Sequence, residues 1–172
     1  MLNIKIKILD KRLGGDFPLP QYETALSAGM DLRAMVDSDF VLNPGEVKMV
    51  NTGFAMHIAD PDVTALIIPR SGLGYKHGIV LSNLTGVIDA DYQGPLMMPL
   101  WNHSNEPFKI CVGDRVAQML FVPVLHANLE ITDHFDEESE RGVKDSDLQV
   151  SSDLGISKDM PFLLCLSYKS SD

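Results

Sequence analysis

Residues 77–102, HGIVLSNLTGVIDADYQGPLMMPLWN, decide the fold class. Two runs rich in β-forming residues, at 77–83 and 95–102, lie on either side of a segment flanked by glycines. Neither run shows a clean helical period, and each has the length of a strand. The stretch therefore predicts two short strands joined by a connecting segment.

The same arrangement continues outward along the chain. Residues 3–9 (NIKIKIL) alternate with period two, and further β-rich runs lie at 47–58, 64–69 and 115–125. The segments between them contain typical turn residues: Asn43-Pro44-Gly45, Asp60-Pro61-Asp62, Gly72 with Gly74, and Gly113-Asp114. A helical turn is expected only near 60–66 or 75–80. The pattern predicts an all-β fold, which is a sandwich, a barrel or a jelly roll.

Composition excludes several classes of protein. A chain of 172 residues fits one domain with a core, and its net charge of −10 argues against a nucleic-acid backbone as partner. The N-terminus lacks a signal-peptide pattern, and no apolar run has membrane-spanning length. Cys111 and Cys165 have neither metal-binding nor redox spacing, so they predict reduced thiols in a cytoplasmic protein.

The character of the sequence changes near residue 133, where a charged, serine-rich segment begins. We expect a β domain over 1–142 and an aberrant, flexible tail over 143–172. The apolar run MPFLLCLSY near the end of the tail has no evident place in that domain.

The segment GVIDADYQG (86–94) carries the candidate catalytic group. In an extended chain, residues two apart point the same way, so Asp89 and Asp91 would share a face. Asp89 could polarise a water for in-line attack on phosphorus, Asn83 could read a base edge, and Tyr92 could pack on a sugar. The alternative is a turn that carries a solvated carboxylate pair.

Three other stretches contain candidate groups. In SAGMDLRA (27–34), Asp31 is either functional or a turn cap. In PRSGLG (69–74), glycines would let backbone N–H groups approach an anion beside Arg70 and Ser71, unless the segment is an ordinary turn. GDRVAQM (113–119) offers Arg115 and Gln118, or is simply a loop that leads into a core strand.

Taken together and in order, these four stretches resemble four of the five motifs of the trimeric dUTP pyrophosphatase (dUTPase) family, and the resemblance covers residues 1–142. It implies a distorted jelly-roll, β-barrel-like subunit of the β-clip type and a homotrimer with three shared active sites. It also implies hydrolysis of dUTP to dUMP and pyrophosphate, with Mg²⁺ on the triphosphate. That reaction supplies dUMP and keeps uracil out of DNA.

The resemblance also assigns roles to single residues. Asp89 would orient the attacking water, while Asp91 would brace the hairpin and Asp31 would lie near the water shell of the metal. The substrate-binding residues would be Asn83, Gly86, Val87, Ile88 and Met97 around the nucleoside, Tyr92 against the deoxyribose, and Arg70, Ser71, Gly72 and Gln118 on the phosphates. Backbone groups near Val87 would pair with uracil, and a tight wall would exclude a 5-methyl group.

The fifth motif of the family, a C-terminal arm reading approximately R-G-x-G-G-F-G-S-[ST]-G, is lost here. Arg141 and Gly142 match it, and then the resemblance ends. Codons can be chosen for residues 144–150 that, with one inserted G, encode KGFGSSG. Our hypothesis is a one-base deletion that puts the chain out of frame from about Asp145.

Two other functions remain open at this point. A dCTP deaminase-like enzyme has a related fold, but no residue here is clearly placed to activate water at a ring carbon. A catalytically poor, nucleotide-binding regulatory homologue is suggested by the lost arm alone.

Overall fold

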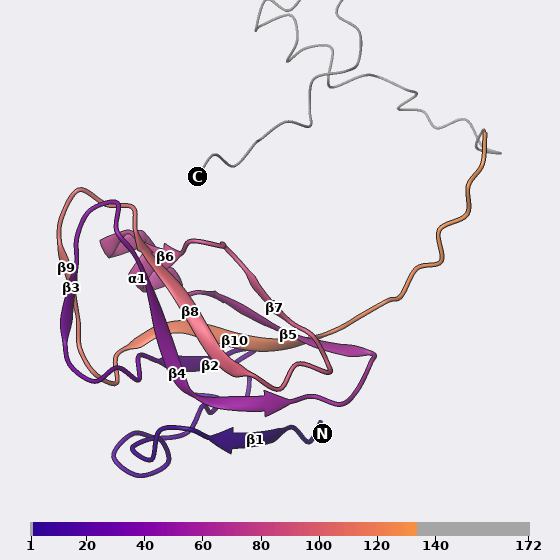
Figure 1. Ribbon diagram of the computed structural model, residues 1–172, viewed down its shortest axis with the longest axis horizontal. Helices are drawn as coiled ribbons and strands as arrows, with labels where there is room; N and C mark the ends of the chain where they lie inside the picture. Colours follow the sequence, from indigo (N-terminus) through magenta and orange to yellow (C-terminus); the bar gives the residue numbers. More distant parts are fainter. Residues whose placement is uncertain (1, 134–172) are drawn as a thin grey trace, which may run out of the picture. The chain divides into compact units, whose positions relative to one another are not determined.

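The computed structural model describes residues 2–133. The chain divides into two units, residues 1–127 and 128–172, and the fold below is that of the first unit. Its elements are β1 (Lys5–Ile8), β2 (Met30–Arg33), β3 (Phe40–Leu42), β4 (Val47–His57), β5 (Val63–Pro69), α1 (Ser71–His77), β6 (Ile79–Leu81), β7 (Gly86–Ile88), β8 (Pro95–Asn102), β9 (Phe108–Ile110) and β10 (Arg115–Pro123). Figure 1 shows them along the chain.

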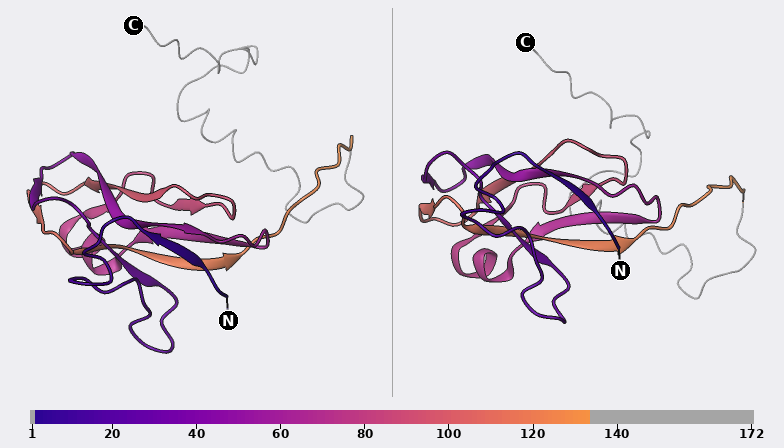
Figure 2. Two further views of the ribbon diagram at one scale, coloured as in Figure 1. Left: turned by 60° about the horizontal axis from the view of Figure 1, so that its bottom comes forward. Right: turned by 90° about the horizontal axis from the view of Figure 1, so that it is seen from below.

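The strands form two antiparallel four-stranded sheets and a two-stranded ribbon. One sheet has the order β1-β4-β8-β6, the other has the order β2-β10-β5-β7, and β3 pairs with β9 in the ribbon. Figures 1 and 2 show these elements from three sides. The predicted all-β, jelly-roll-like architecture is confirmed, with open sheets rather than a closed barrel.

The core joins the two sheets and follows from alternation along the strands. In β8, Leu96, Met98 and Leu100 are buried while Met97 between them is exposed. Leu32 of β2 and Ile67 of β5 belong to the same buried cluster. Side chains that alternate between the two faces of a strand thus give each sheet one buried face, and these faces share one core.

A buried amide ties the β3–β9 ribbon to the end of β8. Asn102 is fully buried, and its Nδ2 donates to the carbonyls of Leu42 (2.9 Å) and Glu106 (2.8 Å). Its Oδ1 accepts from the backbone N–H of Ser104 at 3.0 Å and from the Ser104 hydroxyl at 2.7 Å. Each polar group of this side chain is therefore paired inside the core.

Several local expectations differ from the structure. The glycines of PRSGLG do not form an open turn, because residues Ser71–His77 form helix α1, which ends at Gly78 with φ 65°. A left-handed residue at this position is typical of a helix C-terminus and favours glycine. The helical turn expected near 60–66 is wrong, since β5 begins at Val63. The domain boundary predicted at 142/143 and the tail lie outside the described residues.

Candidate functional site

The connection from β7 to β8 lines an open cavity of about 250 Å³. β7 and β8 lie in different sheets, and the hairpin that contains this connection joins the paired strands β6 and β8. Its lining residues are Val87, Ile88, Asp89, Tyr92, Pro95, Leu96 and Met97. Sequence reasoning had selected five of these, so the structure brings most of the predicted nucleoside site together. Asn83 and Gly86 lie at the other end of β7 and are not among the lining residues.

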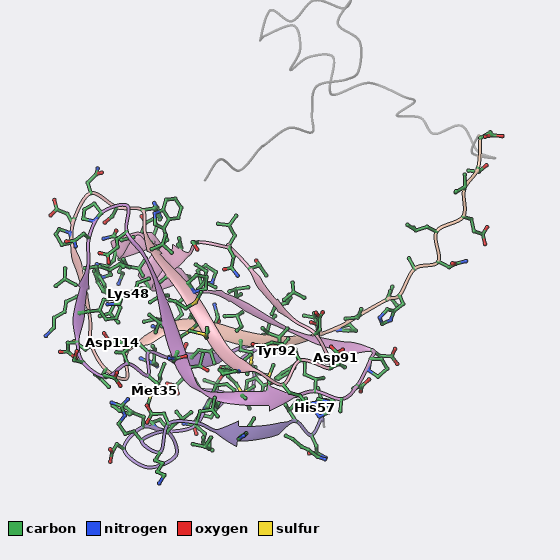
Figure 3. The ribbon with its side chains drawn as sticks, in the orientation of Figure 1. Met35, Lys48, His57, Asp91, Tyr92 and Asp114 are labelled. Carbon is green, nitrogen blue, oxygen red and sulfur yellow. The ribbon has the colours of Figure 1, made fainter. Side chains whose placement is uncertain are left out.

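The chain turns at the aspartate pair instead of continuing as a strand. The backbone N–H of Tyr92 donates to the Asp89 carbonyl at 3.1 Å, which closes a four-residue turn. The argument from strand alternation that Asp89 and Asp91 share a face is therefore wrong. Both side chains are exposed, and Figure 3 shows Asp91 and Tyr92 in this connection.

β7 is an edge strand, which explains how a small cavity can present main-chain groups. It pairs with β5 through Ala65–Ile88, Leu66–Val87 and Ile67–Gly86, and no other strand of the described sheet adjoins it. An edge strand leaves a row of N–H and C=O groups without sheet partners. These groups are available for the polar edge of a planar ligand.

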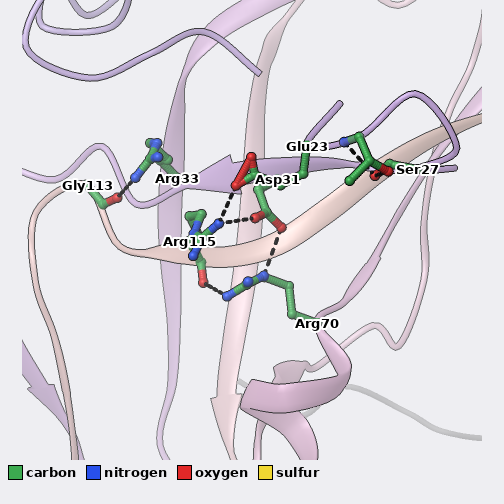
Figure 4. A network of polar contacts seen from close by, with 8 residues as sticks. Glu23, Ser27, Asp31, Arg33, Arg70, Gly113 and Arg115 are labelled. Carbon is green, nitrogen blue, oxygen red and sulfur yellow. Dashed lines mark hydrogen bonds and ion pairs between the residues drawn. The ribbon is translucent and has the colours of Figure 1, made fainter. Parts of the chain in front are cut away.

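A second, polar cavity of about 330 Å³ lies beside β2 and β10. Asp31 connects two arginines there: Arg70 Nε donates to Asp31 Oδ1 at 2.8 Å, and Arg115 Nη1 donates to Asp31 Oδ2 at 3.1 Å. Arg115 Nη1 also donates to Glu23 Oε1 at 3.0 Å. Figure 4 shows this network, in which Arg70 and Arg115 meet at the Asp31 carboxylate and Arg115 also contacts Glu23.

The strand register explains the position of the predicted phosphate residues. Gln118 of β10 lies opposite both Asp31 of β2 and Ile68 of β5, so β10 joins the two segments. Its Nε2 donates to the Pro69 carbonyl at 3.0 Å. Arg70 follows β5 directly, and its Nη1 donates to the Arg115 carbonyl at 2.9 Å. The structure thus gathers Asp31, Arg70 and Gln118 in one place.

Ser71 and Gly72 form the first turn of α1, next to Arg70. A Cβ added to Gly72 would meet nothing within 4 Å, so its surroundings are open. The amides in the first turn of a helix have no partner within the helix. This end of α1 therefore combines open backbone N–H groups with the arginine.

The two halves of the predicted site lie at opposite ends of β5. Ile88 pairs with Ala65 at the beginning of the strand, whereas Arg70 follows its last residue. At a rise of ~3.3 Å per residue, Asp89 and Arg70 are about 20 Å apart along the sheet. One subunit therefore does not bring its own Asp89 next to its own phosphate residues.

Sequence reasoning missed two charged residues of the polar cavity. Arg33 lines it and donates through Nη1 to the Gly113 carbonyl at 2.7 Å. A signal for Arg33 existed, because it lies two residues after Asp31 in the same strand. Glu23 lies in an irregular loop, and nothing in the local sequence indicates its partner.

Within residues 2–133, no three His, Cys, Asp or Glu side chains are grouped so as to hold a metal ion. No helix in this part of the chain is both long and apolar enough to cross a bilayer.

The family model that matches the chain is dUTPase, over residues 15–147. The chain belongs to the dUTPase family. It is 58% identical over 142 residues to the deoxyuridine 5′-triphosphate nucleotidohydrolase of Haemophilus influenzae (strain PittEE), covering 83% of this chain and 93% of that protein. It is also 58% identical over 139 residues to the same enzyme of Shewanella loihica, covering 81% and 91%.

Solved dUTPase structures share this fold. A mutant dUTPase of Staphylococcus bacteriophage 80alpha with dUpNHpp superposes with a TM-score of 0.70 at 26% identity, over 84% of this chain and 96% of that one. A phage phi11 dUTPase, described for its coordination of a structural Mg(II) ion, gives 0.68 at 22% identity, over 78% and 99%. The latter likeness concerns the fold alone.

Proposed function

We propose that this dUTPase-family protein hydrolyses dUTP to dUMP and pyrophosphate, and thereby supplies dUMP and keeps uracil out of DNA. The observation that carries the proposal is the hairpin cavity, which combines an edge strand, a tyrosine wall and a carboxylate. Family membership and the named relatives support it. A cytoplasmic location remains part of the proposal.

Uracil would be recognised by main-chain groups of Gly86, Val87 and Ile88 on the free edge of β7. A backbone edge is rigid, so it can exclude a 5-methyl group sterically better than flexible side chains can. Tyr92 would lie against the deoxyribose and leave no room for a 2′-hydroxyl. Met97 would close the apolar side of the cavity, and Asn83 would approach the base from the start of β7.

Asp89 would act as the general base. Its carboxylate accepts a proton from a water molecule while the water oxygen attacks the α-phosphorus. The bond from the α-phosphorus to its bridging oxygen breaks, and pyrophosphate leaves. Because Asp89 is exposed at the cavity, a water has direct access to it.

Arg70, Ser71, Gly72 and Gln118 would bind the triphosphate. Gln118 lines the polar cavity, whereas Arg70, Ser71 and Gly72 are not among its lining residues and lie beside it, where Arg70 is paired with Asp31. Mg²⁺ fits this site, since it usually takes one or two carboxylates through water together with substrate phosphates. The Asp31 oxygens each accept one arginine bond, and a carboxylate has capacity for more. The ion would neutralise charge on the phosphates, with Asp31 near its water shell.

The shared site requires a second copy of the chain, and we infer a homotrimer. The hairpin and the polar cavity of one subunit are too far apart for one nucleotide, so different subunits would contribute them. The segment after β10 supports association: Leu125, Leu129 and Ile131 recur at even spacings and are almost fully exposed. The segment is not a strand in the described subunit, and apolar residues at alternate positions of its sequence are typical of a segment that forms a strand against a partner.

The test is to measure release of pyrophosphate and ammonia from dUTP and dCTP by the purified protein. Pyrophosphate from dUTP without ammonia is expected. Ammonia from dCTP would favour the deaminase. Binding of deoxyuridine nucleotides with neither product would favour the catalytically poor regulatory homologue.

A further inference from the structure

The position of the Tyr92 ring depends on Gly94, which has no side chain and lies two residues later in the chain. The Tyr92 hydroxyl donates to the Pro95 carbonyl at 3.0 Å, so the ring folds back across the hairpin. In this position the ring forms one wall of the apolar cavity together with Val87 and Met97.

Gly94 lies against the hydroxyl end of that ring. A Cβ built on Gly94 would lie 2.5 Å from Tyr92 Oη, 2.7 Å from Cζ and 3.1 Å from Cε2. Real Cβ atoms essentially never approach another heavy atom within 3.0 Å. Alanine at position 94 and the observed Tyr92 ring are therefore incompatible.

The backbone itself does not require glycine here. Gly94 is absent from the described residues with positive φ, unlike Gly45 and Gly78. An alanine could adopt this backbone conformation without strain. The conflict is with the ring alone, and the half-exposed ring is the part free to move.

We propose that Gly94 is a specificity-determining residue. Because it has no side chain, it leaves room for the Tyr92 ring to lie against the sugar of the substrate. The proposal rests on the proposed function, in which this ring excludes ribonucleotides. An added methyl group displaces the ring, breaks the bond to Pro95 and opens the cavity next to the sugar.

The expected consequence is a loss of discrimination against ribonucleotides, with the fold unchanged. Pockets that reject an added hydroxyl by packing alone discriminate by about 10²-fold. Displacing the Tyr92 ring should lower the discrimination between dUTP and UTP by about tenfold. The ratio of kcat/KM for dUTP to kcat/KM for UTP should fall about tenfold in Gly94→Ala, while the fold stays intact.

A double-mutant cycle tests whether Gly94 acts through Tyr92. Gly94→Ala, Tyr92→Ala and the double variant are compared, with Gly15→Ala as a control, since a Cβ there meets only ordinary contacts at 3.5 Å. We expect Gly94→Ala to change the dUTP/UTP ratio less than about twofold in the Tyr92→Ala background. An unchanged ratio in the single variant, or an equal drop in both backgrounds, would overturn the proposal.

A crystal structure of Gly94→Ala separates this proposal from the proposed function. The hydrogen bond from the Tyr92 hydroxyl to the Pro95 carbonyl should be lost whatever the enzyme hydrolyses. A Tyr92 ring that stays in place would refute the role proposed for Gly94. Calorimetry with dUDP and UDP gives the corresponding ratio of dissociation constants, which does not depend on hydrolysis. A wild type that binds neither nucleotide would refute the proposed function and with it the claim of specificity.

Discussion

Asp89 combines two properties that are seldom found together at a surface turn. Its carbonyl closes the turn to Tyr92, while its carboxylate lines an otherwise apolar cavity. The turn thus fixes the position of Asp89 in the main chain, and the cavity would place a bound nucleotide next to its carboxylate. Asp91, two residues further along the same turn, is not among the lining residues.

Asp89→Asn should therefore lower kcat for dUTP by about 10²–10⁴-fold, since an amide keeps the shape but cannot accept the proton from water. Binding of dUMP should change little. Steady-state kinetics and calorimetry measure the two quantities. Asp91→Asn is the comparison, and it should affect kcat far less. Wild-type turnover in Asp89→Asn would remove this residue from the mechanism.

A second residue-scale prediction concerns Asp10 and pH. The side-chain hydrogen bond from Arg12 lowers the pKa of the Asp10 carboxyl, against a smaller opposing effect of burial. A depressed folded-state pKa contributes stability above the unfolded-state value near ~3.9, and that stability is lost as pH falls through the folded-state pKa. Asp10→Asn should thus lower Tm at pH 7, and the difference should vanish in acid.

Thermal unfolding of the wild type and of Asp10→Asn from pH 7 to pH 2 checks the predicted pH dependence of the Tm difference. The exposed Asp62→Asn serves as the control and should follow the wild type throughout. A Tm difference for Asp10→Asn that stays constant down to pH 2 would show that the ion pair is not its cause.

At the scale of elements, long runs of β-forming residues could be predicted as strands, whereas isolated strands of three residues could not. The predicted run at 95–102 coincides with β8, whereas β3 and β9 have three residues each and no periodicity of their own. These two exist because they pair with each other across 66 residues or more of chain, a contact that local sequence does not encode. The same limit explains Glu23, whose partner Arg115 is distant in sequence.

Asn102 should be the polar group on which the ribbon depends. Asn102→Ala removes the side-chain donor to the buried Leu42 carbonyl, whereas the Glu106 carbonyl keeps the Ser104 hydroxyl as a donor. A buried group that loses its partner costs ~1–3 kcal/mol, so we expect a loss of that order in the free energy of unfolding. Urea denaturation measures it. The exposed Asn105→Ala should cost less than about 0.5 kcal/mol, and equal costs would refute the role.

For the whole molecule, the placement of the two half-sites predicts an obligate assembly. Light scattering at micromolar concentration should give three times the chain mass of 19.0 kDa. Leu125→Asp combined with Leu129→Asp should weaken the trimer and abolish activity together. Both side chains are about nine-tenths exposed or more in the subunit, so the substitutions should affect association and not the fold of the subunit. His126→Asp, on the other side of the alternation, is the matched control. A fully active monomer would contradict the shared site.

The C-terminal sequence separates recognition from catalysis. Residues 143–150 lack the glycines and the phenylalanine that the fifth motif of the dUTPase family places after Arg141 and Gly142. Asp145 and Asp147 would repel a triphosphate. In the family, this arm stacks on uracil and closes over the γ-phosphate, which fixes the phosphates in line with the attacking water.

Closure of this kind acts mainly on the transition state, so losing it should lower kcat more than nucleotide affinity. The hairpin cavity and the arginine network are intact, and dUMP or dUDP should therefore bind nearly as in a complete family member. Rebuilding the sequence from Arg141 as RGVKGFGSSG, followed by a stop, should restore kcat with little change in dUDP affinity. Equal kcat in the two versions would show that the arm is dispensable here. Sequencing the coding DNA for a G-rich tract at codons 144–145 tests the origin of the loss independently of any kinetics.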